Sequence, residues 1–296
     1  MEFAIGIDLG GTRIKGTAVN AEGTMLHKLY TPTDDGNGAV WKNAVAETVN
    51  ELLKKINGSN SVIGISAPGL PSDDNTTIAY MPGRMQGLEN FSWHQFLKRP
   101  TYVLNDAVAA LIGEATSGAA KNKKHVVMLT LGTGVGGAIL INGKPYQGAF
   151  NKAGHIGHMV IDHSGDRDVA GMPGSLEECI GNCTIEKRSK GKFASTQDML
   201  TAYNNGDAFA KEVWLRSIRH LAIGIASLTN ILSPEMIVIG GGIAEANDLL
   251  FEPLNEYMQE FEWRAGGNKA EIVKAVHGDL AGTIGAASFA MNKCYQ

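Results

Sequence analysis

Three glycine-rich segments of this chain each follow a run of apolar residues, and they are the first candidates for a ligand site. At the end of a strand, glycines let backbone N–H groups point at an anion, and a threonine adds a hydroxyl donor. Asp8 precedes the first segment and Lys15 follows it, so charges of both signs lie near that turn. The first two segments therefore indicate phosphate binding, although a structural hairpin explains either one taken alone. The segments are Gly10-Gly11-Thr12, Gly132-Thr133-Gly134 and Gly240-Gly241-Gly242.

The residues that follow these glycines exclude two common nucleotide motifs. Gly132, Gly134 and Gly137 have the G-x-G-x-x-G spacing, but a strand pattern follows where a dinucleotide-binding fold needs a helix. Neither Gly-Thr segment continues into the Gly-Lys-Ser/Thr of a P-loop. The third segment, Gly240–Gly242, precedes a helical pattern, so it could lie against a nucleoside or serve only as a tight turn.

The pair Asn105-Asp106 lies between a short strand pattern and a helical pattern. A carboxylate at this place could take the proton of a substrate hydroxyl during phosphoryl transfer, which needs only modest basicity. Asn105 could hydrogen-bond a sugar hydroxyl. Asp106 would equally suit the N-cap of the helix, so the residues alone leave both of its roles open.

The elements that must position these residues alternate between strands and helices, which predicts an α/β fold. The stretches 3–19 and 126–141 both read as strand, glycine turn and strand, so we expect two halves built on one plan. No Pro- or Ser-rich linker separates them, and closely packed domains with a cleft between them are expected. Other strands are predicted at 62–65, 101–104 and 236–239, and helices at 41–56, from Asp106 through Ala115, at 207–232, at 245–261 and from about 283.

The composition is that of an ordinary globular protein. Of the 296 residues, 44% are hydrophobic, and the net charge of −4 gives no broad positive field for nucleic acid. No apolar run reaches the length of a membrane span, and Met1-Glu2-Phe3 does not resemble a signal peptide. Three cysteines do not make a disulfide framework, so we expect a cytoplasmic protein. The chain has 37 glycines among its 296 residues, about 12% against a typical share of about 7%. They fall in clusters, which indicates several places where the backbone turns sharply or lies close to a ligand.

Three motifs in this order and spacing resemble the ROK family of sugar kinases and regulators, within the actin/hexokinase/Hsp70 superfamily. The resemblance spans nearly the whole chain. It implies a two-domain actin-like ATPase (ribonuclease H-like) fold, with a small domain at 1–117 plus about 280–296 and a large domain at 118–279. The motifs are Ile7-Asp8-Leu9-Gly10-Gly11-Thr12, Asn105-Asp106-Ala107 and Leu131-Gly132-Thr133-Gly134-Val135-Gly136-Gly137.

The resemblance also implies roles for individual residues. Asp106 would be the catalytic base. Asp8 would bind Mg²⁺ through water, and the two Gly-Thr loops with Lys15 would bind the phosphates of ATP. Gly240–Gly242 would lie near the adenosine. The sugar-binding residues would be Gly69, Asn105, Asp106, His155, His158 and Glu177.

Two features depart from the family pattern. His155 stands where the Glu-x-Gly-His motif has an acid. Asp168, Ala170 and Ser175 stand at the three cysteine positions of the zinc-binding members, so a tetrahedral zinc site cannot be built there, and no structural zinc is expected. A displaced site using Cys179, Cys183 and His158 is the alternative. The asparagine usual ahead of Trp93 is also replaced, within Pro82-Gly83-Arg84-Met85.

The leading hypothesis is an ATP-dependent hexose kinase that acts on the 6-hydroxyl of glucose. N-acetylmannosamine, a β-glucoside, allose and fructose are alternative substrates. A sugar-responsive regulator would need a DNA-binding module, for which the start of the phosphate loop at Asp8 leaves no room. A non-catalytic sugar-binding protein is the third hypothesis, and the intact Asp106 and phosphate loops argue against it. No nucleic acid or membrane partner is expected, and the family suggests a homodimer or tetramer.

Overall fold

The structure is a computed structural model that describes residues 3–58, 61–83 and 85–294. Met1, Glu2 and Arg84, which entered the sequence arguments, lie outside these residues. The chain divides into two compact units, each of them built from separate stretches. Unit 1 comprises 1–123, 143–153 and 275–296, and unit 2 comprises 124–142 and 154–274.

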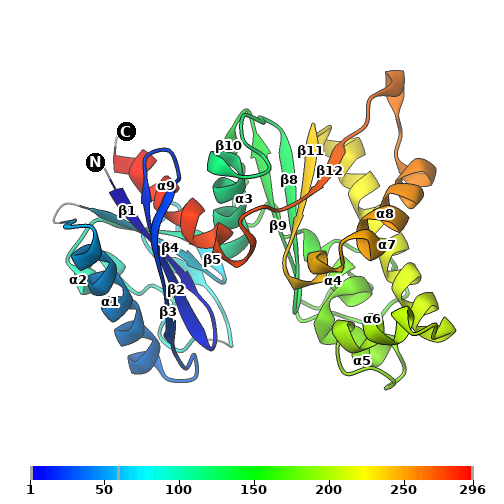
Figure 1. The fold of residues 1–296 in the computed structure, drawn as a ribbon, viewed down its shortest axis with the longest axis horizontal. Coiled ribbons are helices and arrows are strands. Elements are labelled where there is room, and N and C mark those ends of the chain that lie inside the picture. Colours follow the sequence, from blue (N-terminus) through cyan, green and yellow to red (C-terminus); the bar gives the residue numbers. More distant parts are fainter. Residues whose placement is uncertain (1–2, 59–60, 84, 295–296) are drawn as a thin grey trace. The chain divides into compact units, whose positions relative to one another are not determined.

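The centre of unit 1 is a five-stranded sheet with the order β3-β2-β1-β4-β7 (Figure 1). The first three strands are antiparallel neighbours, whereas β1, β4 and β7 run parallel. Every residue of β4 is buried, as expected for a strand covered on both faces. The strands are β1 (Phe3–Leu9), β2 (Arg13–Asn20), β3 (Met25–Pro32), β4 (Val62–Ala67) and β7 (Thr101–Asn105). The short strands β5 (Leu70–Pro71) and β6 (Ile78–Tyr80) form a separate two-stranded sheet.

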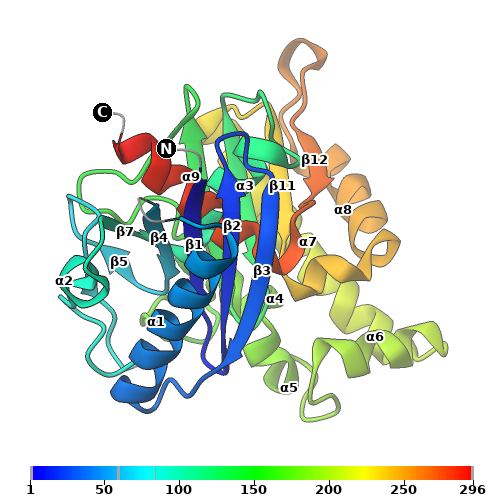
Figure 2. The same ribbon diagram turned by 60° about the vertical axis from the view of Figure 1, so that its left-hand side comes forward.

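Helices cover both faces of this sheet. Ile5 and Ile7 of β1 pack with Trp41 of α1 (Gly38–Lys55), and Figure 2 shows α1 lying against the sheet. Ala4, on the opposite face of β1, packs with Ile284 of α9 (Ala281–Cys294). The remaining helices of unit 1 are α2 (Trp93–Leu97), α3 (Asp106–Ser117) and the 3₁₀ turn η5 (Gly278–Leu280).

Glycines let the backbone of α9 lie directly on its neighbours. A Cβ added at Gly6 of β1 would lie 1.8 Å from the carbonyl oxygen of Thr283, and one at Gly285 would lie 1.7 Å from that of Ala109 in α3. Backbone atoms cannot move aside as the end of a flexible side chain can. These positions therefore require glycine, and they account for part of the chain's high glycine content.

Unit 2 repeats the plan of unit 1. The second five-stranded sheet has the order β10-β9-β8-β11-β12, where β10 is the two-residue strand Lys144–Pro145. In this sheet β9 is antiparallel to β8, and β8, β11 and β12 are parallel, as β2-β1-β4-β7 are in unit 1. The predicted internal duplication of strand, glycine turn and strand is thus present. The strands are β8 (Val126–Leu131), β9 (Val135–Ile141), β11 (Met236–Gly240) and β12 (Glu271–Lys274).

The core of unit 2 packs the sheet against α7 (Ala208–Leu232), which buries Val213, Trp214, Ile218, Leu221 and Ile225. Among the described residues, no helix is both long and apolar enough to cross a membrane. The other helices are α4 (Leu176–Ile180), α5 (Ile185–Arg188), α6 (Thr196–Asn204), α8 (Asp248–Phe261) and the 3₁₀ turns η1 (Ile156–His158), η2 (Asn182–Thr184), η3 (Gly242–Ala246) and η4 (Ala265–Gly267).

Candidate functional site

Asn105 and Asp106 lie where β7 ends and α3 begins. Asn105, at the end of β7, is the N-cap of α3: its Oδ1 accepts from the backbone N–H groups of Ala107 (3.0 Å) and Val108 (3.3 Å). Its Nδ2 donates to the carbonyl oxygen of Gly69, 3.2 Å away. Asp106 is the first residue of the helix and is exposed. The N-cap is therefore Asn105. The carboxylate of Asp106 lies at the surface of unit 1, and its Oδ1 also accepts from the backbone N–H of Ala107, at 2.8 Å.

Gly69 holds a conformation that the pair depends on. Its φ of +99° lies in the left-handed region, and an added Cβ would lie 2.6 Å from the carbonyl oxygen of Tyr80. The residue must be glycine for this turn to place its carbonyl oxygen against the Asn105 amide. Asn105 thus joins the end of β7 to the turn after β4.

Asp8, at the end of β1, makes contacts with both carboxylate oxygens. Oδ1 accepts from the hydroxyl of Ser66, 2.6 Å away, and Oδ2 pairs with Lys15 Nζ at 3.0 Å. Lys15 Nζ also donates to the carbonyl oxygen of Asp279. Because both oxygens of Asp8 already have partners, the residue suits a hydrated Mg²⁺ bound through water better than a directly bound ion.

The first glycine loop is built around a close approach. A Cβ on Gly10 would lie 2.6 Å from the carbonyl oxygen of Arg13. The carbonyl oxygens of Gly11 and Thr12 accept from Asp35 and Thr33, so these two peptides are fixed while the Thr12 side chain is exposed. The loop is a fixed turn that leaves one hydroxyl at the surface.

The second glycine loop is fixed by residues from the α4 region. Glu177 Oε2 accepts from the backbone N–H of Val135 at 2.9 Å, and a Cβ on Gly134 would lie 2.2 Å from the same oxygen. The carbonyl oxygens of Gly132 and Thr133 accept from the backbone N–H groups of residues 182 and 183. The loop after β8 and the predicted sugar residue Glu177 are therefore in direct contact.

The second and third glycine segments border one pocket of unit 2, with a volume of about 780 Å³. This volume is in the usual range for small-molecule sites. Gly241, with φ of +86°, approaches the Leu131 carbonyl oxygen so closely that a Cβ would lie 2.3 Å from it. The pocket is lined by Gly132, Thr133, Asn182, Ser195, Thr196, Gln197, Leu200, Thr201, Asn204, Gly242, Ile243, Glu245, Ala246 and Leu249.

His155 and His158 lie together in unit 2, around η1. Their rings are nearly parallel, with an interplanar angle of 7° and centroids 6.4 Å apart. Burial lowers the pKa of His155, and the neighbouring His158 lowers it further. A neutral His155 ring is therefore favoured at neutral pH.

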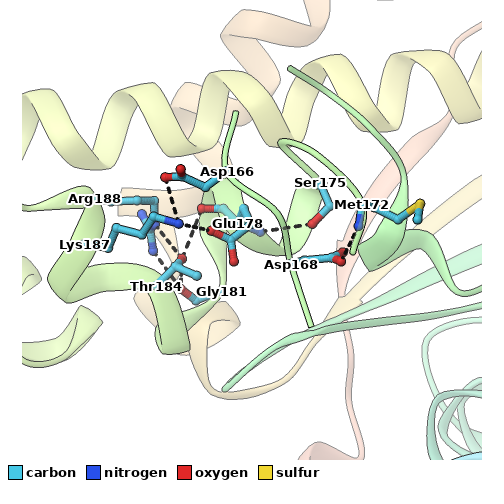
Figure 3. Close-up of polar contacts among 9 residues, drawn as sticks. All are labelled: Asp166, Asp168, Met172, Ser175, Glu178, Gly181, Thr184, Lys187 and Arg188. Carbon is cyan, nitrogen blue, oxygen red and sulfur yellow. Dashed lines mark hydrogen bonds and ion pairs between the residues drawn. The ribbon is translucent and has the colours of Figure 1, made fainter. Parts of the chain in front are cut away.

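His158 is bound to a buried carboxylate. Its Nδ1 lies 2.8 Å from Asp168 Oδ2, and the Asp168 side chain is 0% exposed. Asp168 Oδ1 accepts from the backbone N–H groups of Ala170 and Met172, both at 2.9 Å, and the Ser175 hydroxyl also hydrogen-bonds to this carboxylate. Figure 3 shows Asp168, Met172 and Ser175 close together at the start of α4.

These residues do not fit a structural zinc site. The three positions that correspond to zinc cysteines instead hold the carboxylate of Asp168 and two groups that donate to it, the backbone N–H of Ala170 and the hydroxyl of Ser175. Burial raises the pKa of Cys179 to about 11, so its thiol stays protonated and is a poor zinc ligand. No cluster of three or more His, Cys, Asp and Glu suited to a metal occurs among the described residues.

The profile of the ROK family matches residues 4–293. This chain belongs to the ROK family. A ROK hexokinase from Thermus thermophilus has a similar structure, with a TM-score of 0.88 and 27% identity over 99% of both chains. The fold is accordingly the two-domain actin-like ATPase fold that the sequence motifs predicted.

The ROK relatives include both enzymes and regulators. A glucokinase from Halalkalibacterium halodurans is 32% identical, with 95% of this chain and 92% of that protein covered. A xylose repressor from Bacillus spizizenii is 26% identical, with 97% of this chain and 76% of the repressor covered. Membership of the ROK family therefore does not by itself assign an enzymatic activity.

Sequence reasoning missed two parts of the site. The polar wall of the pocket comes from α6 and the residue before it, where Ser195, Thr196 and Gln197 form no catalytic motif and read as an ordinary helix start. The contact of Asp168 with His158 was also missed. The sequence clue to this contact is that Asp168, ten residues after His158, stands at a position where zinc-binding members have a cysteine.

Proposed function

We propose that this chain is an ATP-dependent hexose kinase that transfers the γ-phosphoryl group of ATP to a sugar hydroxyl. Glucose, phosphorylated at its 6-hydroxyl, is the first substrate to test. The observation that carries the proposal is the exposed carboxylate of Asp106 at the junction of β7 and α3, directly beside Asn105, which is the N-cap of that helix.

The proposed reaction needs a base, a sugar site and an ATP site. Asp106 would take the proton of the sugar hydroxyl as that oxygen bonds to the γ-phosphorus and the bond to the departing ADP breaks. The hydroxyl loses its proton late in a loose transition state, so an ordinary carboxylate is basic enough. His155, His158, Glu177 and the second N–H of Asn105 would contact the sugar.

The 780 Å³ pocket of unit 2 suits the nucleoside of ATP, because it combines backbone-rich glycine loops with polar side chains from α6. Thr133 and the loop 132–134 would contact the phosphates. Mg²⁺ would neutralise phosphate charge when bound, and Asp8 would hold it through water. Lys15 would add positive charge near the first loop.

The test is a hexose panel assayed with purified protein. Glucose, N-acetylmannosamine, a β-glucoside, allose and fructose are each incubated with Mg²⁺ and either ATP or polyphosphate, and the sugar phosphate is identified by ³¹P NMR. We expect glucose with ATP to give the highest kcat/KM. Sugar binding by calorimetry without turnover on any donor would contradict the kinase proposal and favour a sugar-binding regulator.

A further inference from the structure

The carboxylate of Asp168 is surrounded by hydrogen-bond donors. His158 Nδ1, the Ala170 and Met172 backbone N–H groups and the Ser175 hydroxyl all contact it. Burial opposes ionisation of this carboxyl, but the bonds from His158, Met172 and Ser175 together outweigh burial and lower its pKa. The side chain is therefore an ionised acceptor at neutral pH.

An ionised acceptor fixes the tautomer of its histidine partner. A carboxylate cannot donate, so the hydrogen between Asp168 Oδ2 and His158 Nδ1 must be carried by the nitrogen. In the neutral ring the other nitrogen, Nε2, then has a lone pair and no hydrogen. The His158 side chain is 34% exposed while Asp168 is fully covered, so it is the ring that can meet a ligand.

We propose that Asp168 is a positioning residue that holds His158 in the Nδ1–H tautomer, so that Nε2 accepts a hydrogen bond from a sugar hydroxyl. A metal ion on Nδ1 would have the opposite effect, because Nε2 would then carry the hydrogen and donate. This chain thus reverses the polarity that a zinc-bound histidine would offer at the same place. The sugar contact rests on the proposed function, whereas the tautomer does not.

The loop that carries Asp168 is fixed independently of His158. Gly174, with φ of +48°, packs so closely that a Cβ would lie 1.8 Å from the carbonyl oxygen of Asp162. The backbone N–H of Gly174 donates to the carbonyl oxygen of Asp166 at 2.7 Å, and the carbonyl oxygen of Gly174 accepts from the backbone N–H of Ile161 at 2.9 Å. The ion pair of Asp166 with Lys187 is exposed and adds little to these bonds (Figure 3). Asp168 is therefore presented to His158 by a loop with its own anchors, as a positioning role requires.

The test substitution is Asp168→Asn. The variant side chain has one oxygen, and the two backbone donors of residues 170 and 172 favour keeping that oxygen in place of Oδ1. Its NH₂ group would then face His158 Nδ1, which must accept, and the ring hydrogen moves to Nε2. Asp166→Asn is the matched control, because it makes the same change in the same loop but removes only the exposed ion pair to Lys187.

The tautomer is read from long-range ¹H–¹⁵N spectra of protein labelled at histidine, at about pH 8.5, where an ordinary imidazole is neutral. His158→Gln identifies the signals of residue 158. We expect the Nδ1–H pattern in the wild type and in Asp166→Asn, and the Nε2–H pattern in Asp168→Asn. An Nε2–H pattern in the wild type, an unchanged pattern in Asp168→Asn, or a stoichiometric shift of these signals on adding Zn²⁺ would overturn the proposal.

Kinetics then test the contact with the sugar. Asp168→Asn should raise KM for the hexose roughly tenfold, the effect of one lost hydrogen bond, with KM for ATP unchanged. Asp166→Asn should change neither value. If the wild type phosphorylates no sugar, the proposed function fails while the spectra still decide the tautomer; if the tautomer reverses without any change in KM for the hexose, the sugar contact is refuted and the kinase proposal stands.

Discussion

Asp106 and Asn105 are neighbours with different surroundings, and this difference makes the proposed base testable. Replacing Asp106 with Asn keeps the shape of the side chain and removes its basicity. Because Asn105 is the N-cap of α3, the melting temperature of the protein should be unchanged. We expect kcat for the best hexose to fall by roughly 10²–10⁴ with little change in ATP affinity, as measured by coupled assay and calorimetry.

The control for this experiment is Asn105→Ala, which removes the cap and leaves the carboxylate. Loss of a cap costs about 1 kcal/mol, so this variant should unfold at lower denaturant concentration. Near-normal turnover in Asp106→Asn would show that another group takes the proton.

His155 offers a pH-dependent contact with the sugar. Burial, and then the nearby His158, lower its pKa below the ordinary value, so its ring stays a neutral acceptor to lower pH than a free imidazole would. If that acceptor binds the sugar, KM should stay flat from pH 8 down through about 6.5 and rise only below it. The measurement is KM for the best hexose from about pH 5.5 to 8.

His155→Gln provides the comparison, because its amide keeps an acceptor that does not titrate. The rise in KM should be absent from that variant. His158 is unchanged in both proteins, so any rise that it causes is common to the two profiles. Profiles of the same shape would remove His155 from the sugar site.

At the scale of elements, the irregular segment 154–175 is held together by hydrogen bonds to the carboxylate of Asp168, in the place where zinc-binding relatives would have a metal ion. The protein should therefore need no zinc: it should purify without stoichiometric zinc, and EDTA should leave its melting temperature unchanged. Elemental analysis and thermal unfolding measure this directly. One tightly held Zn²⁺ per chain would contradict the prediction and direct attention to Cys179 and Cys183.

The elements differ in how far the sequence could predict them. The apolar stretches 62–65, 126–131 and 236–239 predicted buried strands correctly, because burial on both faces requires apolar residues throughout. The strand β3 was not predicted, since most of its residues are exposed and show no alternation. The helix expected from Glu245 begins at Asp248, because residues 242–246 form a 3₁₀ turn.

The candidate site shows the same limit. Asn and Asp are both good N-caps, so only the end of β7 decides that Asn105 takes the role. The contact between His158 and Asp168 depends on an irregular loop whose path follows no period in the sequence. The positions of the glycine turns were predictable because a turn after an apolar strand is a local feature of the sequence, whereas the polar wall of the pocket from α6 depends on the fold.

At the scale of the whole molecule, unit 1 is closed by the last stretch of the chain. The α9 side chains of Ile284, Ala287 and Met291 pack in one cluster with Ala4 and Val62 of the sheet. The buried carboxylate of Glu114 accepts from the backbone N–H groups of residues 276 and 277, directly before α9. The stability of unit 1 should therefore depend on residues that are more than 100 positions away in the sequence from the rest of this unit.

Ending the chain after Lys274 tests this dependence. Burial of Leu280, Ile284 and Met291 contributes about 5–9 kcal/mol, which is comparable with the whole stability of a domain. The truncation also leaves Glu114 buried with fewer partners, at a further cost. We expect hydrogen exchange, measured by mass spectrometry, to become fast in β1 and β4, while β8, β11 and α7 keep their protection because unit 2 has its own core.

ADP should still slow exchange in residues 195–204 of the truncated chain, since the pocket is lined by unit 2 alone. Equal loss of protection in both units would contradict independent cores and show that unit 2 folds only with unit 1.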